Sequence, residues 1–287
     1  MKTYSDIYLG ARRRLRDAGI EAHELEARLI VAGAAGKTCE ELLNSKMSCV
    51  YDDSIASSVD SMIGRRLEGE PAAYILGEWQ FYGIPVIVSD AVLIPRVDTE
   101  LLADVAIKLL KRRGAGTRVL DLCAGCGCIG LAVASNLPDC RVLLADISER
   151  ALAICRENIL KNQLACSVAS IQADALHKPP ALPDKFDIIV SNPPYIPTGD
   201  INNLDGSVRN YEPALALDGG ADGLKFFRAI AGMWAVLLKQ GGYLAFECGA
   251  GQAGALRDIM REGVFDEIET HIDTLGIERV LVGRKGH

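Results

Sequence analysis

The segment "FDIIVSNPPYIP", residues 186–197, places an amide, two prolines and an aromatic ring directly after a strongly apolar run. If the run is a strand of a parallel sheet, its carboxyl end lies at the edge where ligands of such folds bind. The side-chain oxygen of Asn192 and the main-chain carbonyl of Pro193 can accept both hydrogens of a planar NH2 group, while the Tyr195 ring stacks on that group. With Pro193 and Pro194 in the loop, little backbone freedom remains to be lost on binding.

A planar NH2 nitrogen delocalises its lone pair and is a poor nucleophile, so it must be oriented closely toward an electrophile. Positioning of this kind can contribute up to about 7 to 11 kcal/mol of a barrier. Asparagine and proline are also common residues where a strand ends in a simple turn. An aromatic residue directly after two prolines is an odd choice for a plain solvent turn, and the pattern favours a site for a planar nitrogen.

A second segment, "RVLDLCAGCGCIGLAVA" at residues 118–134, puts glycines between a buried-looking strand and an apolar helix. Gly125 and Gly127 let the backbone approach a ligand closely, and Gly130 lets the helix pack on the sheet. Asp146 ends the next strand, where a carboxylate can accept hydrogen bonds from both ribose hydroxyls. The arrangement predicts adenosine binding.

The same loop contains three cysteines, which raises the alternative of a metal or redox site. Cys123, Cys126 and Cys128 would have to converge on one ion, but a strand-turn-helix aims their side chains in different directions. No second group of Cys or His residues nearby completes four ligands, so we interpret the cysteines as small fillers and expect no metal. The glycines also satisfy G-x-G-x-x-G, and this motif alone leaves an NAD-dependent dehydrogenase or a non-catalytic nucleotide-binding module open.

The composition narrows the class of protein further. The chain has 287 residues, 31 Lys and Arg against 38 Asp and Glu, and a net charge of -7, which makes it a poor general nucleic-acid binder. No apolar run approaches the ~18 residues that span a bilayer, and we expect a cytoplasmic protein without membrane segments. The 9 cysteines are odd in number and show no regular framework, so most should be reduced thiols.

The first 70 or so residues repeat apolar positions at helical spacing and predict a small helical bundle. Thr38 followed by Glu41 resembles a capping box. Residues 79–94 are rich in β-branched and aromatic residues and predict a β-hairpin with a turn at Ser89 and Asp90. Asp98 is a plausible N-cap for an amphipathic helix after the hairpin.

Beyond Asp98, candidate strands alternate with helical patterns between the first five strands. This alternation predicts an α/β fold, a seven-stranded, mostly parallel, Rossmann-like sheet covered on both faces. The last two strands, joined by "DTLG", suggest an antiparallel hairpin. The candidate strands are residues 118–122, 141–146, 167–172, 187–192, 242–248, 267–272 and 279–283.

Together with these motifs, three further segments make the chain similar to a known family. They are "PAAYILGEWQFYG" (71–83), "LIPRVDTE" (93–100) and "YEPALALDGGADGL" (211–224), and with "NPPY" they resemble the HemK/PrmC family of class I S-adenosylmethionine-dependent methyltransferases. The resemblance covers essentially the whole chain. It implies an N-terminal helical domain for substrate docking at residues 1–75, a hairpin linker at 76–95 and a methyltransferase domain at 96–287.

The resemblance also implies an activity. Members of this family methylate the side-chain amide nitrogen (N5) of the glutamine in the GGQ motif of class-1 peptide chain release factors, which supports translation termination. S-adenosyl-L-homocysteine would be the second product, and we expect a monomer. Taken alone, the NPPY motif also fits an N6-adenine nucleic-acid methyltransferase, which would need a basic face or a target-recognition domain that is not visible here.

The family's functional residues transfer to matching positions of this chain. The loop from Cys123 to Gly127 would wrap the methionine part of the cofactor, with Cys123 standing where glycine is common. Asp121 would lie near the cofactor's amino group, and Arg96 and Glu100 would shape the entrance of the site. The cofactor-binding residues implied are Cys123, Ala124, Gly125, Cys126, Gly127, Asp146 at the ribose, Asp174 and Ala175 beside the adenine, and Asn192. The residues implied for catalysis and for binding the glutamine amide are Asn192, Pro193, Pro194 and Tyr195.

Overall fold

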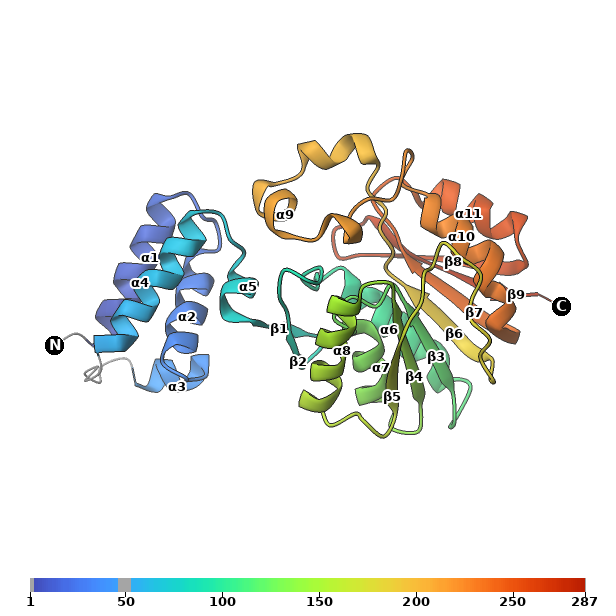
Figure 1. Cartoon of the computed structure of the whole chain (residues 1–287), viewed down its shortest axis with the longest axis horizontal. Helices are drawn as coiled ribbons and strands as arrows, with labels where there is room; N and C mark the ends of the chain where they lie inside the picture. The colour runs from blue at the N-terminus through green and yellow to red at the C-terminus, as the bar shows by residue number, and fades with distance from the viewer. Residues whose placement is uncertain (1–2, 46–52, 287) are drawn as a thin grey trace. The chain divides into compact units, whose positions relative to one another are not determined.

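The computed structural model describes residues 3–45 and 53–286, and its contacts divide the chain into two compact units. The first unit comprises Met1–Glu78 and Asp205–Tyr211, and the second comprises Trp79–Leu204 and Glu212–His287. Figure 1 labels the elements of both units along the chain. The short segment Asp205–Tyr211 joins the helical unit although it comes from the middle of the second unit's sequence.

The first unit is a helical bundle, as its apolar spacing predicts. Leu15, Ile30 and Ile63 come from three different helices and are fully buried together in its core. The capping box is confirmed, because the Thr38 hydroxyl accepts from the Glu41 amide at 3.1 Å and the Glu41 carboxylate accepts from the Thr38 amide at 2.8 Å. The helices of this unit are α1 (Tyr4–Asp17), α2 (His23–Ala34), α3 (Cys39–Asn44), α4 (Asp53–Leu67), α5 (Ala72–Leu76) and α9 (Gly206–Tyr211).

Strands β1 (Glu78–Phe81) and β2 (Ile84–Ile87) form the expected hairpin, but the predicted turn is wrong. The chain reverses at Tyr82 and Gly83, whose φ angles are 47° and 79°. Two consecutive left-handed residues match the twist of the strands they connect, and Gly83 adopts this conformation without a Cβ penalty. The Ser89-Asp90 pair lies beyond the end of β2.

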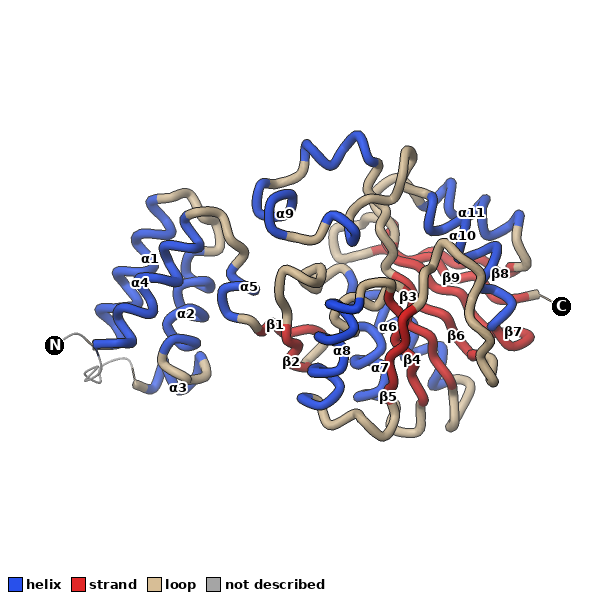
Figure 2. Tube along the Cα trace, viewed as in Figure 1, coloured by secondary structure: helices blue, strands red, loops and turns tan. Residues whose placement is uncertain are grey.

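The second unit is built on a seven-stranded sheet of order β5-β4-β3-β6-β7-β9-β8. Strands β3 to β7 pair in parallel, and β9 pairs antiparallel with both β7 and β8. The mostly parallel sheet and its antiparallel terminal hairpin are therefore confirmed, and Figure 2 shows the strands in red. The strands are β3 (Arg118–Leu122), β4 (Arg141–Asp146), β5 (Val168–Gln172), β6 (Phe186–Ser191), β7 (Leu238–Glu247), β8 (Phe265–Ile272) and β9 (Glu278–Lys285).

Helices cover both faces of this sheet. Successive side chains of β3 point to opposite faces of the sheet. Leu120 and Leu122 lie in one buried cluster with Phe227 of α10, whereas Asp121 between them accepts a hydrogen bond from the Gly130 amide of α7. The crossovers through α7 and α8 advance in the same direction along the sheet and lie on one face. The helices are α6 (Thr99–Lys111), α7 (Cys128–Asn136), α8 (Glu149–Lys161), α10 (Lys225–Met233) and α11 (Ala253–Glu262).

One expected helix is absent. Helical patterns are expected between each consecutive pair of the first five strands, but residues 173–185, between β5 and β6, contain turns and no helix. Pro179, Pro180 and Pro183 interrupt this segment, and each removes a backbone donor that a helix interior needs. The connection therefore runs as a loop from the end of β5 to the start of β6.

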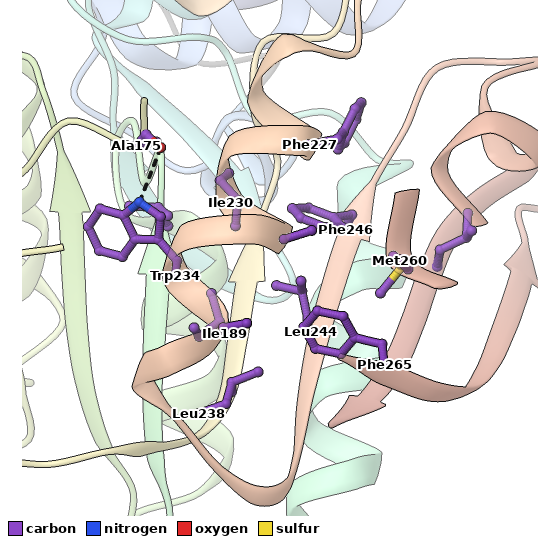
Figure 3. Close-up of a cluster of buried hydrophobic side chains, with 14 of the residues drawn as sticks. Ala175, Ile189, Phe227, Ile230, Trp234, Leu238, Leu244, Phe246, Met260 and Phe265 are labelled. Carbon is purple, nitrogen blue, oxygen red and sulfur yellow. Dashed lines mark hydrogen bonds between the residues drawn. The ribbon is translucent and has the colours of Figure 1, made fainter. Parts of the chain in front are cut away.

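A buried cluster on the α10 side of the sheet holds the second unit together (Figure 3). The rings of Phe227 and Phe246 meet edge to face with centroids 5.1 Å apart, a favourable arrangement for aromatic pairs. Trp234 is fully buried, and its indole nitrogen donates to the carbonyl oxygen of Ala175 at 3.1 Å, the dashed line in Figure 3. The core is thus connected directly to the loop after β5.

Three observations hold for the described residues, 3–45 and 53–286. No helix among them is long and apolar enough to cross a membrane. No group of three or more His, Cys, Asp or Glu side chains is arranged to hold a metal ion. The cysteines described there are all free thiols.

Candidate functional site

A cavity opens at the carboxyl ends of the central strands. Strands β3 and β6 are neighbours, but the chain proceeds from β3 toward one edge of the sheet and from β6 toward the other, and ligands bind at such switch points. The loops that follow four strands contribute to this cavity. Of the residues proposed for the cofactor and the glutamine amide, those that line it are Cys123, Ala124, Gly125, Cys126, Asp146, Asp174, Ala175, Asn192 and Pro194; Gly127, Pro193 and Tyr195 lie outside the lining.

The loop after β3 adopts a tight turn. Cys123, Gly125 and Gly127 all have left-handed φ angles, of 62°, 57° and 83°. A Cβ on Gly127, the N-cap of α7, would lie 2.7 Å from a methyl group of Leu144, so only glycine fits there. Cys123 has no such freedom, and a non-glycine residue in this conformation costs roughly 1–2 kcal/mol. The strained residue therefore lies in the wall of the cavity.

Asp146 supports this loop from the end of β4. One carboxylate oxygen accepts from the Gly125 amide at 2.9 Å, and the other accepts from the Ser148 amide at 2.9 Å. Burial raises the pKa of Asp146, although these amides oppose the shift. Each carboxylate oxygen has a second lone pair, so the side chain can hold the loop and still accept hydrogen bonds from a ligand in the cavity.

Asp121 lies beneath the loop and does not line the cavity. It is fully buried in β3, and one of its oxygens accepts from the Gly130 amide of α7 at 2.8 Å. The other oxygen, Oδ1, has no hydrogen-bond partner within the described residues. Burial raises the pKa of Asp121 to about 7, against the effect of the Gly130 amide, and nearby Asp146 adds to the shift. This position departs from the sequence prediction of a contact near the cofactor's amino group.

Asn158 of α8 supports the site, although no sequence motif predicts this role. Its side chain is fully buried and exchanges hydrogen bonds with the Ile87 backbone of β2, at 2.6 Å to the amide and 3.0 Å to the carbonyl. Its Nδ2 also donates to the Cys126 carbonyl at 3.0 Å. One side chain therefore joins the hairpin, a helix and the loop after β3. An isolated asparagine on an otherwise amphipathic helix carries no sequence pattern that reveals this role.

Three thiols beside the loop, those of Cys126, Cys128 and Cys155, are buried, and that of Cys123 is half-buried. Cys155 of α8 donates to the Gly125 carbonyl at 3.1 Å, and burial raises its pKa well above the ordinary value. Burial likewise raises the pKa of Cys123, and the Cys126 thiol together with burial raises that of Cys128. Because the thiolate is the reactive form, these cysteines behave as packing residues at neutral pH.

The loop after β5 is fixed from the hydrophobic core. The Ala175 carbonyl accepts from the Trp234 indole, as Figure 3 shows, and the His177 carbonyl accepts from the same donor at 3.1 Å. The Asp174 carboxylate accepts from the Leu176 amide at 2.8 Å and lies 2.6 Å from the His177 ring nitrogen. Asp174 and Ala175 are thus held as part of the cavity wall.

The loop after β6 is supported from behind by a glycine-rich segment. The Ile196 carbonyl accepts from the Gly219 amide at 2.8 Å, and a Cβ on Gly219 would lie 2.8 Å from the Tyr195 Cα. The Gln252 side chain donates to the Tyr195 carbonyl at 2.8 Å and accepts from the Gly249 amide at 2.9 Å. No sequence motif predicts the role of Gln252 or of these glycines.

The entrance residues proposed from the sequence have different positions. Arg96 lines the cavity and forms an ion pair with Glu212, which is buried and also accepts from the Ile94 amide at 3.2 Å. Glu100 is not part of the lining; its carboxylate accepts from the Tyr82 amide at 2.7 Å and holds the hairpin turn.

Comparisons with known proteins place this site in a family. Residues 6–77 match the PrmC N-terminal domain, and residues 97–204 match the methyltransferase small domain. The release factor glutamine methyltransferase of Caulobacter vibrioides (strain ATCC 19089 / CIP 103742 / CB 15) is 37% identical over 278 residues, which are 97% of this chain and 95% of the relative. That of Geobacter sulfurreducens (strain ATCC 51573 / DSM 12127 / PCA) is 36% identical over 275 residues, 96% of this chain and 94% of the relative.

The chain belongs to the release factor glutamine methyltransferase family. Membership in this methyltransferase family confirms the resemblance predicted from the sequence. It also excludes the alternative that the glycine loop belongs to a dehydrogenase. Among solved structures, the catalytic domain of hMettl16 in complex with MAT2A 3'UTR hairpin 6 superposes with a TM-score of 0.54. It is 15% identical and covers 84% of this chain and 85% of its own, so it shows a common fold alone.

The buried Asp121 predicts a pH-dependent stability. The folded protein retains the Asp121 proton up to a pH of about 7, whereas the unfolded chain loses it near the ordinary pKa of 3.8. The contribution of Asp121 to the free energy of unfolding therefore decreases as the pH rises from 3.8 to about 7. Asp121→Asn abolishes the charge while keeping an acceptor for Gly130. At each pH the Tm of the variant minus that of wild type is measured by differential scanning fluorimetry. We expect this difference to be at least about 2 °C larger at pH 8 than at pH 5. A constant difference would contradict the raised pKa.

The Asn158 contacts predict a selective loss of ligand binding in this methyltransferase. Asn158→Ala removes the donor to the Cys126 carbonyl, and we expect binding of S-adenosyl-L-homocysteine to weaken about 10-fold or more in calorimetry. Asn162, the C-cap residue that follows α8, donates to the Pro85 carbonyl at 2.9 Å without reaching the loop. Asn162→Ala is therefore the control, and equal weakening in both variants would show that the loop contact is irrelevant.

Proposed function

We propose that this enzyme transfers a methyl group from S-adenosylmethionine to the side-chain amide nitrogen, N5, of the glutamine in the GGQ motif of class-1 peptide chain release factors. The observation that carries this proposal is a single cavity lined both by the glycine loop after β3 and by Asn192 after β6. The names of the relatives support the substrate class. Because release factors act on ribosomes, we also propose a cytoplasmic location.

The lining of the cavity fits an adenosyl cofactor. Gly125 leaves its side of the turn open, with nothing within 4 Å of the position of a Cβ, and Asp146 presents carboxylate lone pairs that can accept from ribose hydroxyls. Ile147, Ala175 and Phe226 supply apolar surface of the kind an adenine ring packs against. When bound, S-adenosylmethionine supplies a methyl group on a positively charged sulfur, which is already an activated leaving group.

The enzyme's own contribution is to hold the acceptor. In the proposed complex the Asn192 side-chain oxygen and the Pro193 carbonyl accept the two amide hydrogens of the glutamine, while the Tyr195 ring stacks on the amide plane. The support behind Tyr195, through Gly219 and Gln252, limits movement of this loop. Rigid positioning of a weak nucleophile is the main source of rate enhancement here. Water can take the proton after transfer, so no dedicated general base is proposed.

A labelling experiment tests the activity. Incubation with S-adenosylmethionine carrying a labelled methyl group should label a class-1 release factor, and a factor with the GGQ glutamine replaced should remain unlabelled. Asn192→Ala should lower kcat/KM by about 100-fold or more, because one hydrogen-bond acceptor for the amide is lost. Undiminished labelling of the replaced factor would overturn the substrate assignment, and methylation of duplex adenine would favour the nucleic-acid alternative.

We further propose that the helical unit at the N-terminus docks the release factor. Residues 6–77 match the PrmC N-terminal domain, and the side chains that line the cavity belong to the other unit. The helical unit therefore contributes binding energy remote from the reacting amide, which a protein substrate can use and a short peptide cannot.

A surface substitution tests the docking proposal. Leu9 on α1 is 51% exposed, and Leu9→Glu should raise KM for the whole release factor about 3-fold or more while leaving kcat/KM for a short GGQ peptide unchanged. Leu160 on α8 is 69% exposed and lies in the other unit, so Leu160→Glu is the matched control. A screen of several exposed α1 positions that left KM for the factor at the wild-type value would contradict the docking proposal.

A further inference from the structure

Gln252 stands at the start of α11 but does not cap that helix. It occupies the N-cap position, and its side chain forms no capping hydrogen bond. Serine, threonine, aspartate and asparagine are the residues that cap helices well; glutamine is not among them, and α11 lacks the stabilisation that a capping side chain gives. The Gln252 side chain instead extends to the end of the loop after β6, where it binds the Tyr195 carbonyl.

Two backbone groups fix the orientation of the Gln252 side-chain amide. Its Nε2 donates to the Tyr195 carbonyl at 2.8 Å, and its Oε1 accepts from the Gly249 main-chain amide at 2.9 Å. A backbone carbonyl only accepts and a backbone N–H only donates, so exchanging the two ends of the side-chain amide would break both hydrogen bonds. The Gln252 main-chain amide also donates to the Gly249 carbonyl at 3.1 Å. Gln252 is thus bound to its own loop twice, which holds the Nε2 donor in place.

Three glycines make room for this contact. A Cβ on Gly223 would lie 2.3 Å from the Tyr195 carbonyl oxygen and 2.6 Å from the Gln252 Nε2, too close for a real carbon atom. A Cβ on Gly249 would lie 3.0 Å from the Gln252 Oε1 and 3.3 Å from Cδ2 of the Tyr195 ring. A Cβ on Gly219 would lie 2.8 Å from the Tyr195 carbonyl carbon. Two separate segments, one before α10 and one after β7, therefore lack a side chain at the place where this hydrogen bond forms.

The peptide unit between Tyr195 and Ile196 is bound at both of its polar groups. Gln252 donates to its carbonyl, and its N–H donates to the Leu217 carbonyl at 3.1 Å. The two prolines before Tyr195 fix their own φ angles. The ψ angle of Tyr195, which sets the direction of the peptide unit relative to the Cα that carries the ring, is therefore held by hydrogen bonds from two other segments of the chain.

The carbonyl contact is the stronger of two that hold Tyr195. At the other end of the side chain, the Tyr195 hydroxyl donates to the Glu247 Oε1 at 3.5 Å, whereas a typical O–H···O hydrogen bond measures about 2.7–2.8 Å. The Gln252 contact, at 2.8 Å, has the ordinary length of an N–H···O hydrogen bond. The position of Tyr195 is therefore set mainly from its backbone.

We propose that Gln252 is a positioning residue for the methyl acceptor: by binding the Tyr195 carbonyl, it holds the NPPY loop (Asn192–Tyr195) in the arrangement that receives the glutamine amide. Gln252 is absent from the cavity lining, whereas Asn192 and Pro194 of the loop line the cavity, so Gln252 acts through the loop. The inference rests on the proposed function, because it assumes that this loop holds an amide. A weak nucleophile reacts only from a narrow range of geometries, so loss of the contact slows methyl transfer while the cofactor still binds.

Gln252→Glu tests this contact with little change of shape. The carboxylate keeps an oxygen for the Gly249 amide but places a second acceptor against the Tyr195 carbonyl, so that hydrogen bond is lost. Gln252→Met, which removes the donor without adding a charge, is a second variant with the same expected result. Gln240→Glu is the matched control, because the Gln240 Nε2 in β7 donates to the Gly286 carbonyl and Gln240 does not line the cavity.

Kinetics should separate positioning from binding. We expect Gln252→Glu and Gln252→Met to lower kcat for methylation of the release factor about 10-fold or more, while KM for the factor and the calorimetric Kd for S-adenosyl-L-homocysteine stay within about 2-fold of wild type. Gln240→Glu should leave all three at their wild-type values. Wild-type kcat in either Gln252 variant, at a Tm equal to that of Gln240→Glu, would overturn the inference.

Amide hydrogen exchange tests the positioning without any substrate. A peptide unit released at its carbonyl opens more often, so the Ile196 amide should exchange about 10-fold or more faster in Gln252→Glu than in wild type, measured by NMR spectroscopy. In Gln240→Glu it should exchange at the wild-type rate. An unchanged Ile196 rate in Gln252→Glu would refute the inference. Faster exchange in that variant, together with failure of wild type to label release factors, would refute the proposed function instead.

Discussion

The parallel pairing of β3 with β6 is the contact on which the site depends. Leu122 and Ser191, the last residues of these strands, lie opposite each other in the ladder, and the Ser191 hydroxyl donates to the Leu122 carbonyl at 2.6 Å. Cys123 and Asn192 follow immediately, so two loops far apart in the sequence begin side by side. A slip of this register by one residue would turn the paired side chains to opposite faces and separate the loops.

Buried carboxylates and close glycine contacts then give these loops their shape. Asp121 and Asp146 bind backbone amides of the first loop and its helix, while Glu247 contacts the second. Gly127 and Gly219 allow approaches that no side chain would permit. Burial raises the pKa of all three carboxylates: Asp121 and Glu247 are fully buried, whereas Asp146 is half-buried in the cavity wall. The site is thus rigid at the expense of local stability.

Much of this architecture can be predicted from the sequence, because hydrophobic runs and turn residues indicate where its strands and turns form. Hydrophobic runs located all seven strands, and the glycines after β3 marked the turn into α7. The hairpin turn was misplaced because Ser89-Asp90 is a stronger turn pair by composition than Tyr82-Gly83. The helix expected between β5 and β6 fails because prolines there outweigh the apolar spacing. Both errors concern short segments in which two local preferences compete: two possible turn pairs in the hairpin, and prolines against apolar spacing between β5 and β6.

The sequence by itself determined the family, the order of strands and helices, and the two loops whose residue types suit a cofactor and a planar amide. Only the tertiary structure decided that Asn158 and Gln252 support these loops. Their roles depend on hydrogen bonds between residues distant in the chain, and a single buried polar residue leaves no periodic pattern to detect. Local propensity reports where an element forms, whereas the direction of a buried donor is fixed by what packs against it.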